Sequence, residues 1–163
     1  MPNMNEFEKH YRPIEQLIYS WARTIDENRV EQIADFMQDA GRYRVKSRFN
    51  HDRNLPLAVI DCKGVSQLKD RILSMRKANV YQPHHYRHMI SGIQILSEPQ
   101  PMVFEVRSNF LITRTMDLSG DMKIFASGQT QDLISLESAT PQFKDRLFLF
   151  DSRVIETLMI IPL

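Results

Sequence analysis

Apolar positions in the first part of the chain recur at the spacing of an amphipathic helix. One stripe of 3.6-residue period consists of Ile14, Leu17, Ile18, Trp21, Ala22 and Ile25. Pro13 precedes this stripe and suits the first turn of a helix. A second, shorter helix is predicted from Val30 to Met37, because Asn28 and Glu31 resemble a capping box. The buried face of a third helix is predicted to hold Val65, Leu68, Ile72 and Met75.

The rest of the pattern is that of β-strands. From Gly41 to Phe49 two sets of residues alternate, with Tyr43, Val45, Ser47 and Phe49 on one face and Arg42, Arg44, Lys46 and Arg48 on the other. Further strands are predicted at 57–62, 88–96, 103–115 and 124–133, with a turn at 98–101 and a hairpin loop at 117–121. A last strand is predicted from about Leu147 to the C-terminus, with a bulge near Arg153.

This order of elements, helices first and antiparallel strands afterwards, predicts an α+β fold. N-terminal helices packed on a long, strongly curved, mainly antiparallel sheet would bury both the helical stripe and the inward-facing strand positions. Such a sandwich is the cone of NTF2-like and cystatin-like proteins. Because no internal repeat or linker interrupts the pattern, residues 1–163 are expected to form a single domain.

Composition mainly excludes classes of function. Twenty-one Lys and Arg against twenty Asp and Glu give a net charge of +1, which argues against a nucleic-acid binder. Cys62 is the only cysteine, so the chain has neither an internal disulfide nor the ligands of a zinc ribbon or iron–sulfur cluster. The N-terminus lacks a secretory signal and no apolar run could span a bilayer, so a cytoplasmic protein without membrane contact is expected.

Histidines and carboxylates offer two candidates for chemistry. His84, His85 and His88 lack a nearby carboxylate, and a spacing of three puts His85 and His88 on opposite faces of a strand, which disfavours a metal site. Asp26, His88 and Asp132 could meet inside the cone as an acid–base site. That possibility leaves open a stand-alone isomerase or dehydratase, or a carrier of a small ligand. Asp26 is equally well explained as a helix-end residue, and Asp132 as a turn former.

The basic strand is the most informative surface feature. Its cations, Arg42, Arg44, Lys46 and Arg48, repel one another unless something acidic covers them. They could belong to a solvated edge strand that charge protects from aggregation, or to a docking surface for an acidic partner subunit. The apolar residues 158–163 also need a cover, which could come from the domain's own helices or from another subunit.

Several short stretches, in a fixed order along the chain, carry a family resemblance. They are Tyr43-Arg44-Val45, Arg53-Asn54-Leu55-Pro56-Leu57, Asp70-Arg71-Ile72, Ala78-Asn79-Val80, Pro83-His84-His85-Tyr86-Arg87-His88, Asp151-Ser152-Arg153 and Pro162-Leu163. In these the chain resembles the small (β) subunit of Rieske-type aromatic-ring-hydroxylating dioxygenases. Residues 44–48 are basic where the benzoate-type branch has an acidic, proline-containing segment, which favours the anthranilate-type branch.

The resemblance implies a non-catalytic subunit with a structural role. It implies a homotrimer of small subunits within an α3β3 terminal oxygenase that degrades an aromatic acid. The large (α) subunit would carry the [2Fe–2S] Rieske cluster and the mononuclear Fe(II), so no cofactor, metal ligand or catalytic residue is expected on this chain. The lone Cys62 agrees with that division, because a Rieske cluster needs two cysteines and two histidines.

Overall fold

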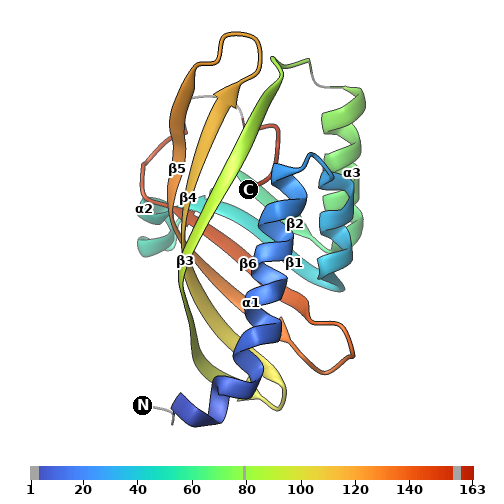
Figure 1. Cartoon of the computed structure of the whole chain (residues 1–163), viewed down its shortest axis with the longest axis vertical. Coiled ribbons are helices and arrows are strands. Elements are labelled where there is room, and N and C mark those ends of the chain that lie inside the picture. The colour runs from blue at the N-terminus through green and yellow to red at the C-terminus, as the bar shows by residue number, and fades with distance from the viewer. Residues whose placement is uncertain (1–3, 79, 156–158) are drawn as a thin grey trace.

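The first helix is longer than its apolar stripe predicts. In the computed structural model, which describes residues 4–78, 80–155 and 159–163, helix α1 spans Met4–Asp26. Pro13 therefore lies inside the helix and not in its first turn. A proline there removes one backbone hydrogen bond and crowds the carbonyl group four residues earlier, and the helix bends near its N-terminal end (Figure 1). The stripe itself is confirmed, since all six of its side chains are buried.

The strands form one mixed sheet, with the long N-terminal helix and the helix Val65–Lys77 together on one side of the view in Figure 1 and the short helix Arg48–Asp52 on the other. The helical elements are η1 (Val30–Phe36, a 3-10 helix), α2 (Arg48–Asp52) and α3 (Val65–Lys77). The strands are β1 (Met37–Ser47), β2 (Ile60–Lys63), β3 (His84–Gln100), β4 (Val103–Met116), β5 (Met122–Ser135) and β6 (Gln142–Phe150). Their order is β2-β1-β6-β5-β4-β3, and only β1 and β6 run parallel. The predicted α+β class and mainly antiparallel sheet are confirmed.

The concave side of the sheet is filled by the chain's own aromatic side chains. Trp21 lies 5.3 Å from Tyr43 and 5.6 Å from Phe143 between ring centroids, and all three are at most 1% exposed. In β4, four apolar side chains of one strand face are buried as well: Phe104, Val106, Phe110 and Ile112. The interior of the cone between α1 and the strands β1, β6 and β4 is therefore a packed core, held by close van der Waals contacts.

Two local predictions near the start of the sheet were wrong. Asn28 does not cap the second helix, because it adopts the left-handed conformation with φ of 57°. The cap residue of η1 is Arg29, which makes no side-chain capping bond. The first strand ends at Ser47, whose hydroxyl oxygen accepts a hydrogen bond from the Asn50 N–H at 3.2 Å and so starts α2. Arg48 therefore belongs to a helix.

Other strand boundaries also differ from the prediction. The short strand β2 begins at Ile60, and Leu57, expected within it, is 72% exposed. Strand β3 begins at His84 and runs through the expected turn to Gln100, so that the chain reverses at 101–102. There Met102 takes the positive φ of 61° that a tight connection between antiparallel strands needs. The hairpin loop at 117–121 is confirmed.

The predicted last strand is wrong in both start and end. Strand β6 spans Gln142–Phe150, and the described end of the chain, 159–163, is not a strand. Residues 156–158 of the prediction, with Leu158 of the apolar run, lie outside the described residues. The Leu163 carbonyl oxygen accepts hydrogen bonds from Trp21 Nε1 at 2.8 Å and from the Tyr43 hydroxyl at 3.0 Å. The domain's own core thus covers the described part of the apolar end.

Candidate functional site

The basic cluster predicted to dock a partner lies on the outer face of the sheet. Along β1, Tyr43, Val45 and Ser47 point inward and are buried, so Arg42, Arg44 and Lys46 face outward. Strand β1 is paired on one side with β2 and on the other with β6. It is therefore not the solvated edge strand considered above, and its charges need another explanation.

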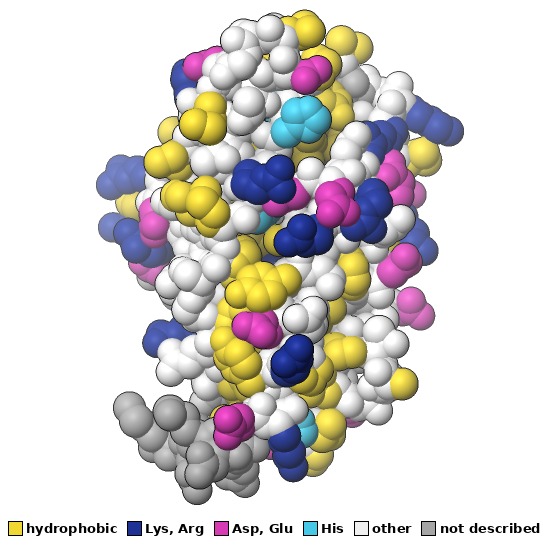
Figure 2. Space-filling model, viewed as in Figure 1, with side chains coloured by type: hydrophobic (Ala, Val, Ile, Leu, Met, Phe, Trp, Pro, Cys, Tyr) yellow, Lys and Arg dark blue, Asp and Glu magenta, His cyan; other side chains and the backbone are white. Residues whose placement is uncertain are grey.

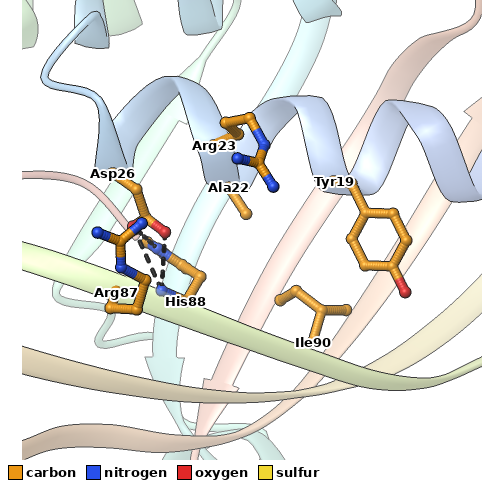
Figure 3. Close-up of a pocket in the computed structure, with 7 residues that line it drawn as sticks. All are labelled: Tyr19, Ala22, Arg23, Asp26, Arg87, His88 and Ile90. Carbon is orange, nitrogen blue, oxygen red and sulfur yellow. Dashed lines mark hydrogen bonds and ion pairs between the residues drawn. The ribbon is translucent and has the colours of Figure 1, made fainter.

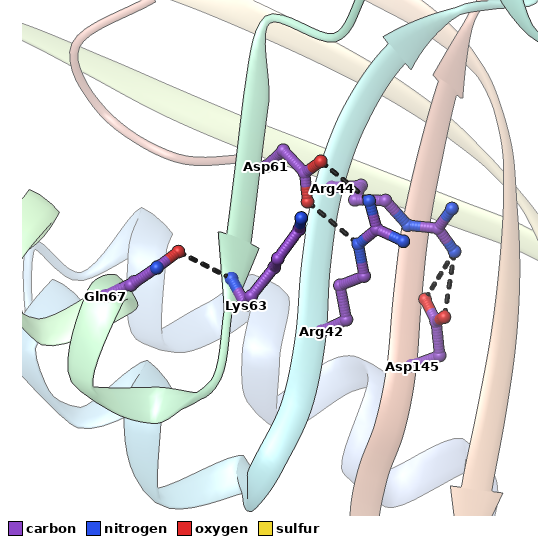
Figure 4. Close-up of polar contacts among 6 residues, drawn as sticks. All are labelled: Arg42, Arg44, Asp61, Lys63, Gln67 and Asp145. Carbon is purple, nitrogen blue, oxygen red and sulfur yellow. Dashed lines mark hydrogen bonds and ion pairs between the residues drawn. The ribbon is translucent and has the colours of Figure 1, made fainter. Parts of the chain in front are cut away.

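Each arginine of the cluster has a carboxylate of the same chain as its partner, and Figure 4 shows the pairs of Arg42 and Arg44. Arg42 binds Asp61 through two hydrogen bonds of 2.8 and 2.7 Å. In β6, Asp145 accepts from Arg44 Nη2 with both oxygens at 2.8 Å, and Arg48 Nη1 lies 2.9 Å from Asp151. The hydrogen bonds with Arg42 hold the pKa of Asp61 below its usual value. The carboxylates that offset the cations of this cluster therefore come largely from the same chain.

Lys46 differs from the three arginines. No carboxylate of the described residues lies within ion-pair distance of Lys46. Its register partner on β6 is Leu149, which is 1% exposed although it lies on the outer side of the sheet, and Arg44 stands in the same way opposite Leu147. Long cationic side chains can cover such leucines with their aliphatic stems while keeping the charge in water. Lys46 is thus the cation of the predicted cluster whose charge remains available to a partner.

The structure brings together two of the three predicted acid–base residues. Asp26 lies at the end of α1 and His88 in β3, and the carboxylate is 2.6 Å from His88 Nδ1. The same carboxylate accepts the His88 backbone N–H at 3.0 Å. The pair lies beside a cleft of about 200 Å³ lined by Tyr19, Ala22, Arg23, Asp26, Arg87, His88 and Ile90 (Figure 3).

The Asp26–His88 contact is arranged as a clamp between two elements. Because Asp26 accepts from Nδ1, the free position of the ring is Nε2, which is buried and has no hydrogen-bond partner. A proton acceptor must come within hydrogen-bond reach of its substrate, and the His88 side chain is fully buried. The carboxylate instead ties the end of α1 to β3 by two hydrogen bonds.

The third predicted residue, Asp132, belongs to a different site. It pairs with Arg146 at 2.9 Å, and both side chains are fully buried. The guanidinium of Arg146 lies 4.9, 4.2 and 4.7 Å from the ring centroids of Trp21, Phe143 and Phe148. Burial raises the pKa of Asp132 to about 6 and lowers that of Arg146. Sequence reasoning missed Arg146, although it shares strand parity with Phe148 and Phe150.

The histidine cluster and the cysteine are placed apart from one another. His85 is exposed and lies 3.7 Å from Asp117, whereas His88 points to the buried side, as the spacing predicted. Among the described residues, no group of three or more candidate ligands could hold a metal ion. Burial raises the pKa of the Cys62 thiol, which disfavours the reactive thiolate and agrees with a structural role. Figure 2 shows cations and acids interspersed on the face that carries α1.

Comparison with known proteins gives the family. The model of the ring hydroxylating beta subunit matches residues 21–157. The chain belongs to this family. It is 26% identical to the anthranilate 1,2-dioxygenase small subunit of Burkholderia cepacia, with 100% of both chains covered. It is 31% identical to the terephthalate 1,2-dioxygenase terminal oxygenase component subunit beta 2 of Comamonas sp, over 88% of this chain and 92% of that one.

A solved structure confirms both the family and the fold. A protein from Novosphingobium aromaticivorans, described as the beta subunit of an aromatic-ring-hydroxylating dioxygenase, superposes with a TM-score of 0.86 at 27% identity. The match covers 96% of this chain and 98% of that one. The predicted NTF2-like cone and the predicted resemblance are confirmed together. In the part of the chain that the structure describes, no helix is long and apolar enough to cross a membrane.

Proposed function

We propose that this chain is the structural small subunit of a ring-hydroxylating dioxygenase that oxidises an aromatic acid. The observation that carries the proposal is the family match over 21–157. The names of two relatives specify anthranilate and terephthalate, which are both aromatic carboxylates, and this supports the substrate class. The filled cone and the buried Nε2 of His88 favour this role over a stand-alone isomerase, dehydratase or ligand carrier.

In this proposal the chain forms one domain, trimerises and holds three large subunits in register as an α3β3 oxygenase in the cytoplasm. The large subunits would carry the [2Fe–2S] Rieske cluster and the mononuclear Fe(II). A Rieske cluster needs two cysteine and two histidine ligands, and the single Cys62 does not supply them. The redox chemistry is therefore assigned to the large subunit. The contribution of this chain is to position the large subunits.

Co-expression with the large subunit of the same oxygenase tests the proposal. We expect the two chains to elute together, and light scattering to give the mass of three copies of each. Separate elution at micromolar concentration would overturn the structural-subunit proposal. A stable complex with another ratio of chains would overturn the α3β3 arrangement.

The outer face of β1 is proposed as part of the contact with the large subunit. The test uses Lys46→Glu, because reversing Arg44 would also break its bond with Asp145 and confuse assembly with folding. We expect Lys46→Glu to weaken the complex, with a loss that shrinks as salt screens the charge. The control is Lys69→Glu, which reverses an exposed charge on α3. Equal affinity of the two variants for the large subunit would show that the outer face of β1 is an ordinary solvated surface.

A further inference from the structure

A second surface joins the end of β1 and combines exposed apolar residues with arginines. It consists of α2, the loop 53–59 and the segment 151–154, and is called here the α2 surface. Leu57 is 72% exposed and Val154 is 76% exposed, with Leu55 and Val59 at 40% and 43%. The loop is held on α2, since Asn50 Nδ2 donates to the Leu57 carbonyl oxygen at 3.2 Å. These apolar side chains are therefore presented by a fixed backbone.

Two arginines on this surface stack on one phenyl ring. The guanidinium carbons of Arg53 and Arg153 lie 3.9 and 4.2 Å from the ring centroid of Phe49. The side chain of Phe49 therefore positions both guanidinium groups. Stacking holds each planar guanidinium in place. Arg53 Nη1 also donates to the Phe49 carbonyl oxygen at 3.5 Å, and the other N–H groups of the two arginines can bind a carboxylate.

These two arginines contrast with the arginines of the basic cluster in β1 and at the start of α2. Arg42, Arg44 and Arg48 each have a carboxylate of their own chain within 2.9 Å. Around Arg53 and Arg153, no carboxylate of the described residues lies at ion-pair distance. Two fixed, uncompensated cations beside exposed apolar side chains form a surface that lacks its acidic counterpart. Such a combination is typical of an apolar contact with a charged rim.

We propose that the α2 surface docks the large subunit of the same oxygenase. The contacting face of that subunit would present carboxylates to Arg53 and Arg153 and apolar side chains to Leu57 and Val154. This inference rests on the proposed function. A two-fold contact between copies of this chain fits less well, because it would oppose the arginines of one copy to those of the other. A contact between copies around a three-fold axis is an outcome of the test below. In the sequence, Lys46 at the end of β1 is separated from α2 by Ser47 alone.

The inference is tested with the full-length small subunit and its large subunit. One variant combines Arg53→Gln with Arg153→Gln, and a second is Leu57→Asp. We expect each to weaken the complex at least tenfold, and the arginine variant also to lose much of the salt dependence of binding. The matched control is Leu118→Asp in the loop between β4 and β5, where an 87% exposed leucine should tolerate the charge without loss of affinity.

The outcomes separate this inference from the proposed function. Failure of the unaltered chain to bind the large subunit overturns the proposed function. Binding by the unaltered chain with equal affinity of both α2-surface variants overturns the inference alone. If the variants lose self-association of the isolated small subunit in sedimentation velocity and still bind the large subunit, the surface belongs to a contact between copies of this chain, which also overturns the inference. Thermal unfolding of each variant checks that folding is retained.

Discussion

The buried Arg146–Asp132 pair gives the sharpest test of how this core is held together. Arg146→Met keeps an unbranched apolar side chain among the rings of Trp21, Phe143 and Phe148 but removes the charge. Asp132, whose side chain is fully buried, would then lose its counter-ion at 2.9 Å. The perturbation therefore tests whether the cost of burying a lone carboxylate exceeds the cost of burying the pair.

The expected loss of stability follows from the carboxylate of Asp132, which Arg146→Met leaves buried without a counter-ion. Removing one partner of a buried ion pair costs about 3–5 kcal/mol, since the other charge stays uncompensated. This is a large share of the roughly 5–15 kcal/mol by which a domain is stable. Adding Asp132→Asn to Arg146→Met removes the stranded charge and keeps the shape. We expect the double variant to recover part of the loss, although either change alone destabilises the fold.

Urea unfolding followed by fluorescence measures the free energies directly. Trp21 is the only tryptophan of the chain and lies next to Arg146, so its emission reports on this part of the core. A loss below about 1 kcal/mol for Arg146→Met would mean that water or a rearranged neighbour compensates the carboxylate, against the argument from burial. A double variant as unstable as the sum of its single changes would show that the two residues are not coupled.

The same pair makes a prediction about pH. Burial raises the pKa of Asp132 to about 6, above the value of about 3.9 for an unfolded aspartate. The folded state then binds the proton more tightly, so the contribution of this group to stability is full below about pH 4 and is lost as pH rises through 6. The free energy of unfolding of the unaltered chain should fall relative to that of Asp132→Asn between pH 4 and 7. A difference that rises over this range would contradict the assigned direction.

Two smaller changes test the contacts at the ends of the chain and of α1. Tyr43→Phe removes two buried hydrogen bonds, since the hydroxyl donates to the Leu163 carbonyl oxygen and accepts its N–H, and should cost about 2–3 kcal/mol in urea unfolding. Tyr19→Phe on the exposed face of α1 is its control and should change little. Asp26→Asn weakens the clamp on His88 and should increase amide hydrogen exchange at the start of β3; unchanged exchange would show that packing alone holds α1 there.

Local periodicity of apolar residues predicted the helices and strands that bury one face and expose the other. The stripe around Trp21 and the alternation in β4 could be read directly, because one face of each element meets the core. Strand β6 could not, since its first half carries Lys144, Asp145 and Arg146 and its apolar second half is buried on both sides. An inward-facing arginine breaks the pattern, and only its pairing with Asp132 from another strand explains it.

The sequence predicted where the cations of the candidate site lie, but it did not predict which carboxylates pair with them. The alternation located the cations of β1, but their partners come from other parts of the chain, Asp61 in β2 and Asp145 in β6. Which carboxylate meets which arginine depends on which strands pair and in which register, and pairing between strands far apart in the sequence leaves no local sequence signal. The docking prediction for this cluster stays a prediction, carried now mainly by Lys46.

The distribution of paired and unpaired arginines separates folding from assembly. Arg42, Arg44 and Arg146 meet carboxylates of their own chain and connect neighbouring strands, so their charges are already used in the fold. Arg53 and Arg153 stack on a ring of α2, and no carboxylate of the described residues lies at ion-pair distance from them. The aromatic side chains around Trp21 fill the core among the described residues, so we expect this subunit to influence an oxygenase through its surface. Its specific contacts should therefore lie where charge is fixed and uncompensated, at the α2 surface and Lys46, and the paired arginines of the sheet should affect assembly only by destabilising the fold.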